Sequence, residues 1–253
     1  MKILIREHPT GCFFCVIISS NDCNVMAEQI KQTYGKEARE GHLGGCYLGG
    51  DPGTYYPRMW EYLVKEYKLE SVLDIGCGAG HSSKFFADNG CEVVGVDGSI
   101  GAMESFLLPG QFILNDYEEG SAITEKNIEI DGDQDEVFDL CWSCEFVEHV
   151  WEKYSQNFIN DFAKCKYLAM TFAGPGQGGY HHVNLQPAEY WIEVMEKNGF
   201  TYLSEETEKL RGLCKEDYEE QIKSDVIIPW NGKKLSDGFN SHFMLRGLFF
   251  ARK

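Results

Sequence analysis

The stretch 72–80, VLDIGCGAG, constrains the fold of this chain more than any other. A short apolar strand pattern leads directly into glycines at positions 76, 78 and 80. In an open parallel sheet, the turn after the first strand carries glycines because a ligand approaches the backbone there. The stretch therefore predicts a strand-to-helix turn that faces a ligand.

Strand and helix patterns alternate from residue 58 to the end of the chain. Predicted strands cover 71–75, 91–97, 111–116, 137–144, 167–173 and 200–205, predicted helices cover 58–67, 82–89, 99–107, 151–164 and 187–199, and the apolar run 242–253 completes the sheet. Alternating elements with apolar strands predict an α/β fold, a mostly parallel sheet with helices on both faces.

The N-terminal part follows a different pattern. The apolar run 12–18 is far shorter than the roughly 20 residues of a membrane span, so we interpret it as a hairpin and expect no membrane span. A short helix at 24–35 and a glycine-rich loop at 39–57 come next, and loops of this length are often lids or binding loops. We therefore expect an N-terminal hairpin, helix and lid-like loop at 1–55 and the main domain at 56–253.

Charge and cysteine content restrict the environment and the partners. The net charge of −17 repels phosphate backbones, and no basic run offsets it, so we expect no nucleic-acid partner. Ten cysteines without a secretory signal fit a reducing cytoplasm. The pairs Cys12/Cys15 and Cys141/Cys144 have a spacing that can chelate zinc, but residues three apart in a strand point to opposite faces, so we interpret them as buried small hydrophobes.

The glycine turn fits neither of two common nucleotide motifs. A dinucleotide fingerprint, Gly-x-Gly-x-x-Gly, needs glycine at 81 or 83, where the chain has His81 and Ser83. A phosphate-binding P-loop needs Gly-Lys followed by Ser or Thr, which is absent here. A carboxylate at Asp74 would also repel a pyrophosphate, whereas it would attract a cationic ligand.

The remaining pattern, Asp-x-Gly-x-Gly-x-Gly, resembles motif I of the class I S-adenosylmethionine-dependent methyltransferases. The resemblance extends to CEVVGVDGS at 91–99, FILNDYE at 112–118 and FDLCWSCEFVEHV at 138–150. It implies a Rossmann-like sheet of seven strands with an antiparallel last strand, and a cofactor released as S-adenosylhomocysteine. The relatives that this chain resembles most are small-molecule and glycan-modifying methyltransferases.

The resemblance also implies which residues bind the cofactor. The acidic residue of the glycine turn orients the amino acid end of the cofactor, and an acidic residue after the second strand binds the ribose. An acidic residue after the third strand reaches the adenine, and an aromatic neighbour packs on the adenine ring. Residues after the fourth strand flank the methionine part. On this chain the positions are Asp74, Gly76, Cys77, Gly78, Gly80, Asp97, Gly98, Ser99, Asp116, Tyr117, Trp142, Ser143 and Glu145. We interpret Glu148 and His149, which follow, as structural residues of the next turn.

The acceptor side is predicted after the fifth strand, in GPGQGGYHHVNLQPAEYW at 174–191. An alcohol acceptor needs a base, and His181 or His182 can take a proton near neutral pH. We expect Tyr180, Asn184, Tyr55 and Tyr56 to contact the acceptor; for Tyr55 and Tyr56 the alternative is a hydrophobic plug that packs the N-terminal part onto the core. The alternative, a turn that only caps the next helix, stays open. We expect no metal, because no carboxylate stands close to the histidine pair in sequence, and metal ligation by the pair is the alternative.

The sequence thus predicts O-methylation of a hydroxyl on a sugar, a glycan or a similar polar small molecule in the cytoplasm. N-methylation of a small amine is one alternative, since an acidic surface attracts amines. A cofactor-binding module that regulates a partner without catalysis is another.

Overall fold

The structure is a computed structural model that describes residues 4–5, 41–43, 51–125, 127–129, 137–224 and 241–253. The predicted hairpin at 12–18, the pair Cys12/Cys15 and the predicted helix at 24–35 lie outside these residues. Strand β1 (Leu4–Ile5) pairs antiparallel with β5 (Ile128–Glu129) as a small separate sheet. Among the described residues, no helix has the length and apolar character that crossing a bilayer requires.

The main sheet has seven strands in the order β4-β3-β2-β6-β7-β9-β8. Their bounds are β2 (Ser71–Ile75), β3 (Glu92–Asp97), β4 (Phe112–Leu114), β6 (Phe138–Ser143), β7 (Cys165–Met170), β8 (Phe200–Tyr202) and β9 (Leu248–Arg252). Strands β4, β3, β2, β6 and β7 run parallel, while β9 lies antiparallel between β7 and β8. The predicted fold class is confirmed, including the antiparallel last strand.

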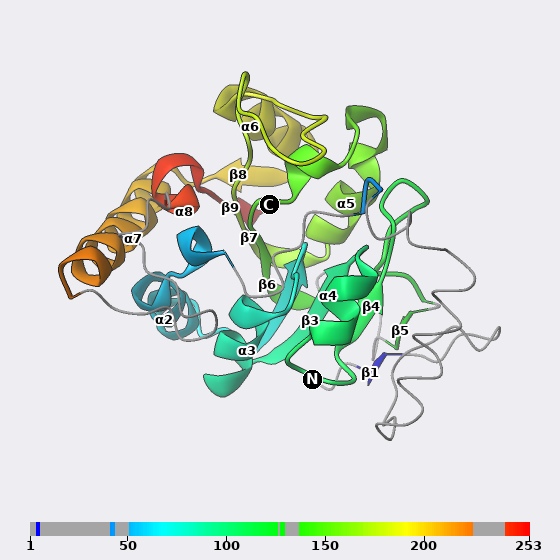
Figure 1. The fold of residues 1–253 in the computed structure, drawn as a ribbon, viewed down its shortest axis with the longest axis horizontal. Helices are drawn as coiled ribbons and strands as arrows, with labels where there is room; N and C mark the ends of the chain where they lie inside the picture. The colour runs from blue at the N-terminus through cyan, green and yellow to red at the C-terminus, as the bar shows by residue number, and fades with distance from the viewer. Residues whose placement is uncertain (1–3, 6–40, 44–50, 126, 130–136, 225–240) are drawn as a thin grey trace.

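Helices cover both faces of this sheet, as Figure 1 shows. Their bounds are α2 (Pro57–Glu66), α3 (His81–Asp88), α4 (Ile100–Ser105), α5 (Ser155–Phe162), α6 (Ala188–Lys197), α7 (Ser204–Ser224) and α8 (His242–Arg246), with 3-10 turns η2 (Pro52–Thr54), η3 (Val147–His149) and η4 (Glu152–Tyr154). On one face, α5 and α6 pack on Leu73 and Ile75 of β2. On the other, α2, α3, α7 and α8 pack on Val72. Alternate residues of β2 therefore serve two cores, which explains its continuous apolar pattern.

Two predicted elements differ from the structure near the C-terminus. The strand predicted at 200–205 ends at Tyr202, and helix α7 begins at Ser204. The run 242–253 is not one strand, since it forms α8 before β9. A Cβ at Gly247 would lie 2.2 Å from the Phe243 ring, so Phe243 folds back over this glycine. The helix in the run was missed because apolar residues alone do not distinguish a short buried helix from a strand.

The topology places a ligand site at the carboxyl end of β2. This strand pairs with β3 on one side and β6 on the other, so the chain order reverses there. Ligands bind to open α/β sheets at such a reversal, outside the carboxyl ends of the strands. The glycine turn at 76–80 follows β2 directly and lies at this position.

Candidate active site

A cavity of about 400 Å³ opens at the carboxyl ends of β2, β3, β4 and β6. Its wall also includes His42 and Leu43, residues of η2, and the loop that precedes α6. This volume lies within the range of small-molecule sites. The cavity therefore joins the strand ends to the segments that the sequence assigns to the acceptor and the lid.

The glycine turn adopts backbone angles that favour glycine. Gly76, Gly78 and Gly80 have φ values of 74°, 54° and 81°, in the left-handed region that side chains disfavour. A Cβ at Gly76 would lie 2.7 Å from Phe146 Cβ, and one at Gly80 would lie 2.4 Å from the Phe106 ring. Gly76 and Gly78 line the cavity, whereas Gly80 is not part of its wall. Gly80 is therefore required by packing within the protein.

Two carboxylates sit beside this turn. The buried Asp74 accepts hydrogen bonds from Ser82 Oγ at 2.7 Å and Ser83 Oγ at 2.6 Å, and burial raises its pKa to about 6. Asp97 accepts from the backbone nitrogens of Gly78 at 2.9 Å and Ser99 at 2.8 Å, while burial raises its pKa as well. Both line the cavity, so this end of it carries negative charge and favours a cationic ligand.

The segment 41–43 covers the end of the cavity near β3 and β4. His42 Nε2 lies 2.7 Å from Asp116 Oδ2, and a Cβ at Gly98 would lie 2.5 Å from Leu43. The Tyr180 hydroxyl donates to the Gly41 carbonyl at 2.8 Å. The loop before α6 and the segment 41–43 thus meet over the cavity, where the sequence places a lid.

A charged network lies where the sequence places the methionine part of the cofactor. Glu145 has a φ of 54°, which is rare for a side chain other than glycine. Its Oε2 lies 3.0 Å from His242 Nδ1, and His242 Nε2 lies 3.0 Å from Asp51 Oδ2. Hydrogen bonds and charges from His242 and Arg246 outweigh burial and lower the pKa of Glu145 to about 2. Sequence reasoning missed Asp51 and His242, because both come from distant segments without a motif.

The network predicts a pH-dependent stability. The two carboxylates outweigh burial and raise the pKa of His242 from 6.5 to about 9. The contribution of the charged His242 to the free energy of unfolding is therefore complete below pH 6.5 and is lost as the pH rises towards 9. We expect His242→Gln to lower the free energy of unfolding by about 2 kcal/mol at pH 6 and by much less at pH 9.5. Urea unfolding of the wild type and the variant at these two pH values measures the difference in stability. A difference that does not depend on pH would contradict the assigned role of the charged His242.

On the acceptor side, the structure distinguishes between the two candidate histidines. His182 lines the cavity together with His149, Gln177 and Tyr180. His181 has a φ of 47° and is not part of the cavity wall, and its ring lies 6.1 Å from the Trp151 ring, centre to centre. His182 is therefore the candidate that can reach an acceptor in this cavity.

Most predicted cofactor residues line the cavity, whereas most predicted acceptor contacts do not. Ten of the cofactor positions do so: Asp74, Gly76, Cys77, Gly78, Asp97, Gly98, Asp116, Tyr117, Trp142 and Glu145. Gly80, Ser99 and Ser143 lie behind the wall. Among the four predicted acceptor contacts, only Tyr180 lines the cavity. Of the cofactor residues, Tyr117 turns its hydroxyl towards α5, where it donates to Asp161 at 2.9 Å.

The remaining three predicted acceptor contacts are not part of the cavity wall. Tyr56 is 1% exposed, and its hydroxyl accepts from Phe243 N at 2.9 Å. Tyr55 packs its ring against Trp60, with centroids 5.9 Å apart. Asn184 is buried and donates to Ser155 Oγ at 3.2 Å. Each of the three side chains therefore contacts a neighbouring element of the protein in this structure.

The pair Cys141/Cys144 is free of disulfides. Cys141 belongs to the core under α5 and α6, while Cys144 packs against the core on the other face. The two side chains therefore serve opposite faces of the sheet, as the strand pattern predicts.

Comparison with known proteins shows what the central part of the chain is similar to. Residues 73–165 match the family model described as a methyltransferase domain. A curated protein from Oryza sativa subsp. japonica, a probable chloroplastic tocopherol O-methyltransferase, is 30% identical over 142 residues. The alignment covers 53% of this chain and 35% of that protein, so the chain spans about a third of the length of its curated relative.

Solved structures with low sequence identity are similar to the chain over most of its length. A Haemonchus contortus phosphoethanolamine N-methyltransferase 2 matches 93% of this chain and 60% of its own, with 18% identity and a TM-score of 0.45. The [4+2]-cyclase SpnF matches 90% of this chain and 96% of its own, with 15% identity and a TM-score of 0.45.

Proposed function

We propose that this chain, whose residues 73–165 match a methyltransferase domain, is a class I S-adenosylmethionine-dependent methyltransferase that methylates a hydroxyl of a sugar, a glycan or a similar polar small molecule. The observation that carries the proposal is one continuous cavity that is lined by the glycine turn, by Asp97 and by His182. The first two belong to the predicted cofactor site and the third to the predicted acceptor site. A cofactor and an acceptor in the same cavity can meet without a large rearrangement.

The residues of the cavity fit S-adenosylmethionine. Its ammonium and sulfonium groups are cationic, and Asp74, Asp97 and Glu145 supply negative charge along the wall. Gly76 and Gly78 leave the backbone at the turn without side chains, so a ligand can approach it closely. The bound cofactor supplies an electrophilic methyl group on its sulfonium.

Different residues of the cavity bind the cofactor, activate the acceptor and exclude water. Asp97, held by the backbone nitrogens of Gly78 and Ser99, offers oxygen acceptors to ribose hydroxyls. Glu145 lines the cavity where we assign the methionine part of the cofactor, and its negative charge favours the sulfonium. His182 activates the acceptor hydroxyl, and the segment 41–43 with Tyr180 limits the access of water.

The acceptor class rests on the polar character of the wall near His182. Gln177, His149 and Tyr180 surround it, and such groups orient a ligand that carries several hydroxyls. The curated relative is named as an O-methyltransferase, which supports oxygen as the methylated atom. The acidic wall favours one second candidate, N-methylation of a small amine, because it would attract a protonated amine.

Two measurements test the proposal. Calorimetric titration with S-adenosylmethionine and separately with NADH should show micromolar binding of the first alone. Transfer of a labelled methyl group should then be assayed against panels of sugars and of small amines. Transfer to amines only would replace O-methylation by the second candidate, and cofactor binding without any transfer would favour a regulatory module.

A substitution at Asp97 tests the ribose site. We expect Asp97→Ala to weaken S-adenosylmethionine binding by about 1.5–3 kcal/mol, the range for hydrogen bonds to a charged group. Asp97→Asn keeps one oxygen acceptor for the backbone nitrogens of the turn, so its loss of S-adenosylmethionine affinity should be smaller. Calorimetry measures both affinities, and unchanged affinity in the alanine variant would show that Asp97 does not bind the ribose.

Charge and cysteine state support two further parts of the proposal. A chain with a net charge of −17 is a poor partner for nucleic acid. The six described cysteines are free, which is typical of proteins in a reducing compartment. We therefore propose a small-molecule or glycan acceptor and a cytoplasmic location.

A further inference from the structure

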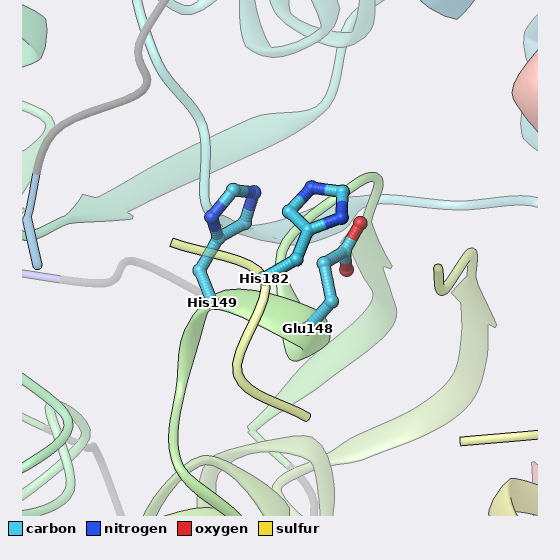
Figure 2. Close-up of side chains that lie close together, drawn as sticks. All are labelled: Glu148, His149 and His182. Atoms are coloured by element: carbon cyan, nitrogen blue, oxygen red, sulfur yellow. The ribbon is translucent and has the colours of Figure 1, made fainter. Parts of the chain in front are cut away.

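Three side chains that can bind a metal meet at the edge of the cavity. Glu148 and His149 belong to η3, and His182 comes from the loop before α6. One ligand atom from each lies within 4.8 Å of the others. Figure 2 shows the three side chains extending in the same direction, with the His182 ring between the His149 ring and the Glu148 carboxylate. Sequence analysis found no carboxylate partner for His181 and His182, because Glu148 is distant from them in sequence and approaches His182 only in the fold.

Backbone contacts hold this cluster together. The nitrogens of Val183 and Asn184 both donate to the Glu148 carbonyl, at 2.9 and 3.1 Å. They fix the residues after His182 against η3. The His149 and His182 rings consequently lie 5.0 Å apart, centre to centre, with an angle of 84° between their planes.

The His182 ring is positioned by its own loop. A Cβ at Gly179 would lie 2.1 Å from His182 Nε2, so the ring can occupy its place only against a glycine. His182 Nδ1 lies 3.3 Å from the Gln177 carbonyl, which leaves Nε2 available to a ligand. Histidines that bind metals commonly donate their second nitrogen to a carbonyl in this way.

Buried polar atoms without hydrogen-bond partners indicate a site for a cation. The Glu148 side chain is fully buried, and within the described part of the chain neither of its carboxylate oxygens has a hydrogen-bond partner. The same holds for His149 Nδ1. The neighbouring cation Arg246 instead donates to the Phe172 carbonyl and contacts Glu145. Burying polar groups without partners is costly, and a bound cation would satisfy these atoms.

We propose that Glu148, His149 and His182 bind one divalent transition-metal ion of the zinc type. Two imidazole nitrogens with one carboxylate oxygen suit Zn²⁺, Co²⁺ or Fe²⁺, whereas Mg²⁺ and Ca²⁺ prefer oxygen ligands alone. Three protein ligands leave a coordination position open, as in catalytic zinc sites. His149 and His182 line the cavity, so the open position faces the acceptor.

The role of the ion rests on the proposed function, whereas its binding does not. A metal ion that binds a hydroxyl lowers the pKa of that hydroxyl. His182 would then activate the acceptor as a metal ligand and would not itself take the proton. Metal binding and cofactor binding can be measured separately, so a failure of one is distinguishable from a failure of the other.

The test uses the full chain after removal of metals with a chelator. Calorimetry with Zn²⁺ and visible absorption with Co²⁺ should show one ion per chain. We expect Glu148→Gln and His182→Ala each to weaken binding by about 100-fold or more, since each removes a ligand. Zinc affinity that is equal in the wild type and both variants, or no binding at all, would overturn the proposal.

Two glycine substitutions that remove no ligand provide a control in case the ligand variants fail to fold. Gly179→Ala removes no ligand but displaces the His182 ring, so Zn²⁺ affinity should fall by about 10-fold or more. Gly178→Ala adds the same methyl group where nothing lies within 4 Å and should bind Zn²⁺ like the wild type. Calorimetry with S-adenosylmethionine on the same samples reports on the proposed function. Equal zinc affinity in the two glycine variants would contradict the assigned place of His182.

Discussion

Replacing Gly78 by valine is expected to weaken S-adenosylmethionine binding by about 100-fold or more, which corresponds to about 2.7 kcal/mol. Gly78 lines the cavity, has a φ of 54°, and donates its backbone nitrogen to Asp97. A branched side chain disfavours this backbone angle and projects from the turn that the cofactor must approach. The variant therefore disturbs both the turn and the carboxylate assigned to the ribose.

A second glycine provides the control for this variant. Gly212 lies in α7, where a Cβ would meet nothing within 4 Å. Gly212→Val introduces the same side chain away from the cavity and should leave cofactor affinity unchanged. Calorimetry compares the two variants, with thermal unfolding to show that both are folded. Normal binding by Gly78→Val would mean that the cofactor does not approach this turn.

The strand ends of the site could be predicted from the sequence because they follow from local patterns. An apolar strand, a glycine turn and an acid after the next strand are close in sequence, and parallel pairing brings them to one edge of the sheet. Asp74, Gly78 and Asp97 line the cavity for this reason. The antiparallel position of β9 followed from the resemblance to a family, since no local pattern specifies which neighbours a strand will have.

The opposite wall could not be predicted in the same way. His42 and Asp51 come from the predicted lid-like loop at 39–57 and His242 comes from the C-terminal run, and nothing in the sequence indicates that these two segments share a site. For Tyr56 the sequence left two interpretations open, an acceptor contact or a hydrophobic plug, and the side chain is buried in the core beside Trp142 and Phe243. Helix α7 was missed because only a few of its residues, such as Leu210 and Cys214, are buried against the core.

Replacing His182 by alanine is expected to lower the rate of methyl transfer by about 10²–10⁴-fold, the range for a group that activates a nucleophile. Cofactor affinity should change little, because His182 belongs to the acceptor side of the cavity, away from Asp74 and Asp97. The reduction should appear in kcat and in kcat/KM alike, since activation of the hydroxyl is needed only in the transition state.

His181→Ala distinguishes the ring of His182 from the loop that carries it. Both substitutions remove an imidazole from the same turn, but only the His182 ring lines the cavity. We expect His181→Ala to retain most of the activity over a range of pH values. Equal losses in the two variants would show that the conformation of the loop matters more than either ring. Full activity in both would remove the pair His181 and His182 from the acceptor chemistry.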